Sequence, residues 1–232
     1  MWSGPRNIST ALMYSFAQRD DTRVVDEPLY AHYLNVTGAL HPGRKEVLAE
    51  QDNDGDEVLR RLLSDPLDRP ILFVKQMAHH LVGIDLAKLD PARNILLIRD
   101  PREMLPSLAE VLGTVQLEDT GMTTQVDLVR HLEKKGQMPF CIDSRELLLA
   151  PEAILRKICG RLDLPFDRKM LSWLPGPRSE DGVWARHWYS GVHRSSGFQS
   201  WKPSKRDLPA TLEPLLDQCR ELYDFLYRRA IR

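Results

Sequence analysis

The stretch from Trp2 to Phe16, WSGPRNISTALMYSF, decides the fold class of this chain. A glycine, a proline and an arginine (Gly4 to Arg6) precede two hydroxyl residues, Ser9 and Thr10, and an apolar run at helical spacing follows. This order predicts a loop that runs into the N-terminus of a helix. Backbone N–H groups and the helix dipole form an anion site at such a terminus, and the hydroxyls and the guanidinium of Arg6 add donors.

The loop departs from the usual nucleoside-triphosphate loop, GxxxxGK[ST]. Counted from Gly4, Ser9 stands at the second glycine, Thr10 at the lysine and Ala11 at the magnesium-binding hydroxyl. The motif therefore fails at three places. A capped helix with an exposed Arg6 explains the same letters, and this stretch alone leaves both interpretations open.

Hydrophobic patterning predicts an α/β protein with a parallel central sheet and helices on both faces in three layers, because strands alternate with helices. The expected strands are 23–28 (RVVDEP, ending near Asp26), 70–76, 94–101 and 138–144. The expected helices are 8–16, 43–64 with an exposed turn at QDNDGDE, 102–112, 123–135, 151–162 and 209–229. Only Met1 to Ser3 precede Gly4, so either the first strand is short or the start of the chain is truncated.

Composition limits the function classes. The 32 basic and 33 acidic residues nearly cancel, which argues against a dedicated nucleic-acid or membrane-surface protein. Three scattered cysteines predict neither a disulfide framework nor a zinc site, and a cytoplasmic location is expected. No apolar run is long enough for a membrane span, and no signal peptide is expected. The oligomeric state is not readable.

Two later motifs have spacings that suit an anion site. In ILLIRDPREMLPSL, Arg99 ends a predicted strand and Ser107 follows eight residues later, near the start of the next helix. The end of a strand in an open α/β sheet points into the ligand crevice. In HRSSGFQSWK, Arg194 stands seven residues before Trp201 in a segment without clear periodicity. A surface arginine and a helix-face serine are the alternative interpretation of the first pair.

Together these motifs resemble the sulfotransferases that use 3′-phosphoadenosine 5′-phosphosulfate (PAPS). That family has P-K-x-G-T-T, then R-[ND]-P with a serine eight residues beyond the arginine, then R-K-G-x-x-G-x-W-K. This chain has arginine at the lysine, Ile8 at the glycine, and Gly197 one place late. The resemblance spans Trp2 to about Lys202. It implies a P-loop NTPase-like fold, a single sulfotransferase-like domain over 1–232, and a long loop or lid at 173–202.

The resemblance also implies a cofactor site and a reaction. PAPS is the expected co-substrate, with no metal, and a hydroxyl or amine of a small-molecule or lipid-like acceptor receives the sulfuryl group. Arg6 is expected to stabilise the leaving phosphate. The implied cofactor-binding residues are Gly4, Arg6, Asn7, Ile8, Ser9, Thr10, Arg99, Ser107, Arg194, Ser195, Ser196 and Gly197.

The general base has three candidates. Glu27 ends the second expected strand, and His79 and His80 follow the third. Each has an alternative interpretation as a helix cap or core-edge residue, and the base remains open. Aromatic residues in EPLYAHYL (27–34) and DGVWARHWYSG (181–191) either line the acceptor pocket or anchor the long loop.

Two other functions compete with sulfuryl transfer. A divergent P-loop kinase or nucleotide hydrolase shares the sheet and the anion loop, and Asp100 is its nearest candidate for a magnesium-binding carboxylate. A non-catalytic relative that binds a nucleotide or a partner is the other alternative. The acceptor itself, and whether oxygen or nitrogen is sulfated, cannot be read from the sequence.

Overall fold

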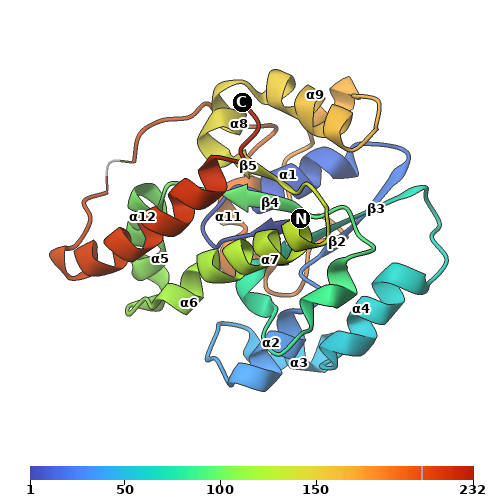
Figure 1. Cartoon of the computed structure of the whole chain (residues 1–232). Helices are drawn as coiled ribbons and strands as arrows, with labels where there is room; N and C mark the ends of the chain where they lie inside the picture. Colours follow the sequence, from blue (N-terminus) through green and yellow to red (C-terminus); the bar gives the residue numbers. More distant parts are fainter. Residues whose placement is uncertain (205) are drawn as a thin grey trace.

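A computed structural model describes residues 1–204 and 206–232. Five parallel strands form one sheet in the order β2-β3-β1-β4-β5 (Figure 1). The strands are β1 (Trp2–Ser3), β2 (Thr22–Asp26), β3 (Ile71–Met77), β4 (Ile95–Ile98) and β5 (Phe140–Asp143). The predicted α/β class with a parallel central sheet is confirmed.

The shortest strand lies at the centre of the sheet. Trp2 of β1 pairs with Gln76 of β3 on one side and with Leu96 of β4 on the other. The chain then turns at once into the loop before α1 (Ser9–Ala17). Because all the strands are parallel, the loops after β1, β2, β3 and β4 meet at one edge of the sheet.

Six further helices of the described residues lie largely where the hydrophobic pattern predicts them. They are α3 (Arg44–Glu50), α4 (Gly55–Ser64), α5 (Pro101–Leu112), α7 (Met122–Lys134), α9 (Pro151–Arg161) and α12 (Glu213–Tyr227). The predicted turn inside 43–64 separates α3 from α4. There the Asp54 side chain accepts hydrogen bonds from the amides of Asp56 and Glu57 and so caps α4.

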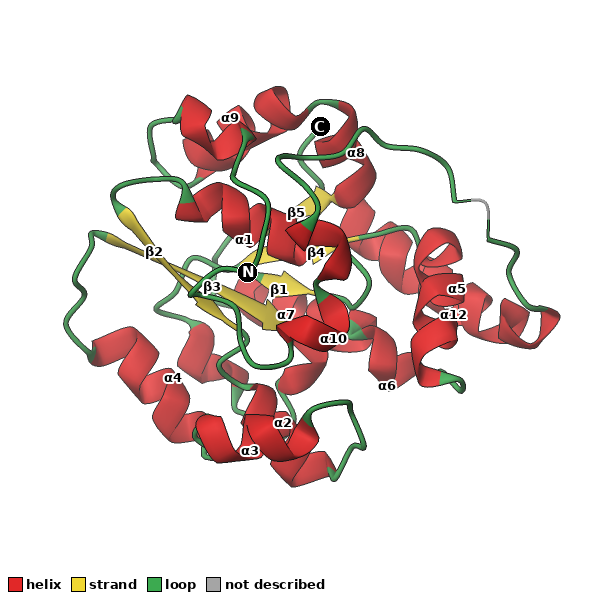
Figure 2. Ribbon diagram, turned by 180° about the vertical axis from the view of Figure 1, so that it is seen from behind, coloured by secondary structure: helices red, strands yellow, loops and turns green. Residues whose placement is uncertain are grey.

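Alternate residues of β4 point to opposite faces of the sheet, where they pack against different helices. Ile95 and Leu97 pack in the core with α1, α9 and α8 (Ser144–Leu149). Leu96 and Ile98 pack with α7 and α12 on the other face. Helices therefore cover both faces, as Figures 1 and 2 show from opposite sides.

Four short helices were not predicted from the sequence. They are α2 (Tyr30–Thr37), α6 (Leu117–Thr120), α10 (Ala185–Trp188) and α11 (Ser190–His193). The last two lie inside the segment 173–202, which was expected to be a long loop. In Figure 2, α10 of this segment lies next to the sheet. The Tyr189 hydroxyl, in the same segment, accepts a hydrogen bond from the side chain of Lys75 in β3 at 2.6 Å.

Candidate active site at the carboxyl edge of the sheet

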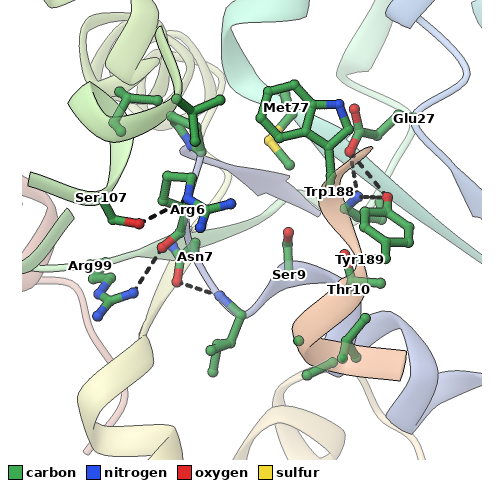
Figure 3. Close-up of a pocket in the computed structure, with 18 of the residues that line it drawn as sticks. Arg6, Asn7, Ser9, Thr10, Glu27, Met77, Arg99, Ser107, Trp188 and Tyr189 are labelled. Carbon is green, nitrogen blue, oxygen red and sulfur yellow. Dashed lines mark hydrogen bonds and ion pairs between the residues drawn. The ribbon is translucent and has the colours of Figure 1, made fainter. Parts of the chain in front are cut away.

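A cavity of about 690 Å³ opens at the carboxyl ends of the central strands. This volume suits a small-molecule site. Most of the residues predicted for the site line it: Arg6, Asn7, Ile8, Ser9, Thr10, Glu27, His79, His80, Arg99, Ser107, Arg194, Ser195 and Gly197. In Figure 3, Arg6, Arg99 and Ser107 lie on one side, and Glu27, Trp188 and Tyr189 lie on the other.

Two predicted cofactor residues, Gly4 and Ser196, are not among the residues that line the cavity. A Cβ atom at Gly4 would lie 2.9 Å from the carbonyl oxygen of Thr120, so close packing explains this glycine. The carbonyl of Ser196 accepts a hydrogen bond from the amide of Trp173 at 3.1 Å. Both residues support the site from outside.

The start of α1 presents hydrogen-bond donors to the cavity. The first N–H groups of a helix have no acceptor within it. The amide of Ile8 is satisfied by the Asn7 side chain at 2.9 Å, and no side chain caps the helix. Ser9 and Thr10 are buried, yet their hydroxyls make no hydrogen bond within the described residues. These donors remain available to an anionic ligand.

Arg6 connects the opening loop to the second motif. Its Nε donates to the Ser107 hydroxyl at 2.9 Å, and Nη1 of Arg99 donates to the Arg6 carbonyl at 2.8 Å. Arg6 also has a φ of 52°, a left-handed conformation that is strained for a residue with a side chain. The fold therefore brings Arg6, Arg99 and Ser107 together, as their spacing predicted.

Positive charge gathers at this end of the cavity. Burial lowers the pKa of Arg6, and the charges of Arg206 and Arg99 lower it further. Arg206, which was not predicted, lines the cavity and also contacts Glu110 at 2.8 Å. Three guanidinium groups this close favour a multiply charged anion between them.

The last predicted motif, residues 193–202, presents fewer free donors to the cavity. Arg194 lines the cavity and is exposed. The Ser195 hydroxyl is already engaged, because it donates to the Val192 carbonyl at 2.7 Å and accepts from Nε1 of Trp173 at 3.1 Å. A Cβ at Gly197 would lie 2.9 Å from the Leu171 carbonyl oxygen, so this glycine is required for close packing.

A buried ion cluster lies at the other end. Lys75, which has no exposed surface, donates to Asp26 at 2.9 Å, to Glu27, and to the Tyr189 hydroxyl at 2.6 Å. Tyr189 in turn donates to the second oxygen of Asp26 at 2.6 Å. Asp26 and Lys75 are register partners at the ends of β2 and β3, so the sheet itself positions this pair.

Burial sets the protonation of the cluster. It raises the pKa of Glu27, and the neighbouring Asp26 charge adds to this while Lys75 opposes it. Burial disfavours the ammonium of Lys75, but the charges of Asp26 and Glu27 outweigh burial and raise its pKa. Lys75 therefore keeps its proton, and Glu27 is more basic than an ordinary carboxylate.

The two predicted histidines are poor proton acceptors in this setting. Burial lowers the pKa of His79 to about 3 and also lowers that of His80. Their Nδ1 atoms are buried without a hydrogen-bond partner among the described residues. The ring of His80 stacks on Tyr30 with 4.8 Å between ring centroids and on Tyr33 with 4.9 Å. Their environment therefore favours Glu27 as the base.

Aromatic side chains line the rest of this end. Tyr30 lies 5.3 Å from Trp184 and 5.8 Å from His41, and Tyr33 lies 5.6 Å from His41 (ring centroids). His41 is 6.3 Å from Trp188. Both aromatic stretches singled out in the sequence thus reach the cavity. Trp184 is also buried, so it anchors the segment 173–202 as well.

Residues 1–230 match the sequence model of a family described as the sulfotransferase domain. The chain belongs to this family. The sulfotransferase domain from the Synechococcus PCC 7002 olefin synthase has the same fold, with a TM-score of 0.55 and 17% identity. That likeness covers 96% of this chain and 92% of the olefin synthase domain.

Two curated relatives come from Arabidopsis thaliana. They are named branched-chain-amino-acid aminotransferase-like proteins 2 and 1, and they are 39% and 40% identical to this chain over 226 residues. These matches cover 97% of the chain but 40% of each relative, so the chain spans two fifths of their length. In the described part of this sulfotransferase domain, no helix has both the length and the apolarity to cross a bilayer.

Sequence reasoning missed Lys75, Asp26 and Arg206 as residues of this site, and it singled out Tyr189 only as a member of the aromatic stretch 181–191. A signal for the first two was present, because an acidic residue and a lysine end two consecutive predicted strands. Arg206 follows Lys202 in a basic stretch just past the last motif. The contact of Tyr189 with Lys75 had no such signal, since it joins residues 114 positions apart.

Proposed function

We propose that this sulfotransferase domain transfers a sulfuryl group from PAPS to a hydroxyl or amine of a small-molecule acceptor. The supporting observation is that one cavity joins a cluster of arginines at a helix N-terminus to a carboxylate of raised basicity among aromatic rings. The first end suits a nucleotide bisphosphate, and the second suits an acceptor that must lose a proton.

The residues at the arginine end fit PAPS. The unengaged hydroxyls of Ser9 and Thr10 stand at the start of α1, beside Arg6. Arg99, just after β4, and Ser107 of α5 add a charged and a neutral donor. When bound, PAPS supplies the sulfuryl group and a phosphate leaving group. The guanidinium of Arg6 would stabilise the charge that develops on that phosphate, and it stays protonated throughout because of its high intrinsic pKa.

Glu27 is the proposed general base. Its carboxylate lies at the cavity wall, and the ammonium of Lys75 holds one of its oxygens. A raised pKa makes it a better proton acceptor while the ion pair with Lys75 keeps it oriented. In the step itself, a bond forms between the acceptor atom and sulfur, the bond from sulfur to the phosphate oxygen breaks, and the acceptor proton passes to Glu27.

The kinase alternative receives less support from the residues present. Asp100, its candidate magnesium ligand, is the N-cap of α5 and accepts a hydrogen bond from the Arg102 amide at 2.8 Å. The loop also lacks the lysine that holds the β- and γ-phosphates of a triphosphate. A non-catalytic relative would keep the bisphosphate site but would show no turnover.

Thermal shift with 3′,5′-bisphosphoadenosine, compared with ATP and magnesium, tests the proposal. At a ligand concentration of 100 times Kd we expect about 2.7 kcal/mol of stabilisation, or roughly 5–10 °C for a chain of this size. Arg99→Ala should abolish the shift, and Arg102→Ala, an exposed position one turn away, should keep it. A shift with ATP and magnesium alone would contradict the proposal. Bisphosphate binding without turnover of any acceptor would indicate the non-catalytic alternative.

A further inference from the structure

We propose that the acceptor carries a positively charged ammonium group, which binds among the aromatic rings and against Asp119. The inference rests on the proposed function for the identity of the two ends, because it assigns the aromatic end to the acceptor. It concerns a group remote from the reacting atom, so the acceptor class is an amino alcohol or a diamine.

Aromatic rings pack side by side at this end of the cavity and contribute to its wall. Tyr30, Tyr33, His41, Trp184 and Trp188 all line the cavity, and consecutive ring centroids lie 5.3–6.3 Å apart. Faces of tyrosine and tryptophan attract cations through the ring quadrupole. His80 stacks on Tyr30 and on Tyr33, so the ring surface that still reaches the cavity is what favours a cation over an uncharged group of the same shape.

The carboxylate of Asp119 lies at the same end of the cavity as these rings. Asp119, in the short helix α6, lines the cavity. After burial, its charge is the next cause that raises the pKa of Tyr33, and it also opposes the lowering of the His41 pKa by burial. One oxygen of Asp119 accepts the amide of Gln116 at 2.8 Å, and the other makes no hydrogen bond within the described residues. A negative charge thus lies next to two of the rings.

The aromatic end offers an anion little attraction. Burial lowers the pKa values of His41 and His79, which keeps both rings uncharged at neutral pH. Lys75 is fully buried and is paired with both Asp26 and Glu27, so its charge is already balanced. At the opposite end, Arg99 contacts Glu103 at 3.4 Å and Arg206 contacts Glu110 at 2.8 Å, whereas Arg6 makes no ion pair within the described residues. Charge along the cavity therefore changes from positive at the proposed cofactor end to negative at the acceptor end.

A pair of matched probes tests this inference: choline, and its uncharged isostere 3,3-dimethylbutan-1-ol. Both are titrated calorimetrically into the full chain, with and without saturating 3′,5′-bisphosphoadenosine. We expect choline to bind about tenfold more tightly, which corresponds to about 1.4 kcal/mol. Asp119→Asn should weaken choline about five- to tenfold and leave the isostere unchanged.

Two more variants make the test independent of any one substitution. Trp188→Leu should weaken choline while keeping an apolar wall, and it serves if Asp119→Asn disturbs the capping of α6. Glu118→Gln removes the adjacent exposed carboxylate, which does not line the cavity, and should change neither affinity. Bisphosphate binding shows that each variant is folded.

The outcomes separate this inference from the proposed function. Equal affinity for the two probes, or choline binding that ignores both Asp119→Asn and Trp188→Leu, overturns the ammonium inference. If the bisphosphate still binds in that case, the proposed cofactor stands. If the bisphosphate fails to bind, the proposed function falls, and the ratio of choline to isostere affinity measured without it still decides the inference.

Discussion

Two residues at opposite ends of the cavity have an unusual backbone conformation. Arg6 and Glu27 have φ values of 52° and 40°, in the left-handed region that favours glycine. Each conformation costs about 1–3 kcal/mol. Arg6 lies in the loop after β1, Glu27 directly follows β2, and both line the cavity (Figure 3). Glycine would relieve the strain but would remove the charged group, so the strained residues are consistent with function.

Replacement of Glu27 by glutamine tests its role as the base. We expect turnover to fall by about 10²–10⁴, with bisphosphate binding retained. In the unmodified protein, the carboxylate must be ionised to accept a proton. Its raised pKa therefore places the acid limb of kcat/KM above the ordinary pH of about 4.5. Activity should rise with pH through this limb, and Glu27→Gln should remove it.

The same shift has an opposite effect on stability. The folded protein holds the Glu27 proton more tightly than the unfolded chain does, so the free energy of unfolding falls as pH rises from about 4.5 through the raised pKa. Glu27→Gln should flatten this part of the stability curve. Glu50→Gln, at an exposed position of α3, is the control and should change neither profile. An acid limb that persists in a partly active Glu27→Gln would exclude Glu27 as the base.

At the scale of elements, hydrophobic periodicity predicted the helices that pack on the sheet. It did not predict α2 or α10, because aromatic residues on these short helices contact other aromatic residues and the cavity as well as the core. Tyr30 of α2, for example, meets Trp184 at the start of α10 across more than 150 residues. Periodicity records which face of a helix is buried, but it carries no information on such a distant partner.

The buried carboxylate of Asp181 anchors the segment 173–202 to helix α1. Asp181 accepts hydrogen bonds from the Tyr14 hydroxyl of α1 at 2.6 and 2.8 Å and from the amide of Arg178 at 2.9 Å. Nε2 of His193 also lies 2.9 Å from it. The carboxylate is 4% exposed, so water does not replace these partners. This contact holds the segment that carries Tyr189 and Arg194 over the cavity.

Asp181→Asn should loosen the segment 173–202. The loss of a charge-assisted hydrogen bond costs about 1.5–3 kcal/mol, which we expect to appear locally as faster proteolysis between residues 173 and 202 and faster amide exchange there. Bisphosphate affinity should fall as well. Glu180→Gln changes the half-buried neighbouring carboxylate, which does not contact Tyr14, and should leave all three unchanged. Unaltered protection in Asp181→Asn would show that other contacts hold the segment.

At the scale of the whole molecule, the sequence predicted the layers but not the order of the strands. Four strands were identified from apolar runs, yet nothing in those runs places a two-residue strand at the centre of the sheet. The site, too, was predicted only in part. Ordered motifs located Arg6, Arg99 and Ser107, whereas the cluster around Lys75 needed the register of β2 against β3. Adjacency of strands is set by tertiary packing, which a single sequence does not display.

A side chain of α7 helps to hold the short central strand β1 in the sheet. Nε2 of Gln125 donates to the carbonyls of Trp2 at 2.9 Å and of Leu97 at 3.0 Å. The Leu97 carbonyl also accepts from Asn7 in the opening loop at 3.2 Å. Gln125 therefore joins β1, β4 and, through a shared acceptor, the loop that forms the proposed cofactor site.

Gln125→Leu should destabilise the whole chain, since two buried carbonyls lose a donor. We expect a loss of about 1–3 kcal/mol in urea unfolding, or a few degrees in Tm. Gln218→Leu, at an exposed position of α12, is the matched control and should be close to neutral. Because Asn7 still donates to Leu97, bisphosphate affinity should fall less than stability does. A stability loss no greater than that of the control would mean that backbone pairing alone secures the central strand, and that Gln125 merely fills space beside it.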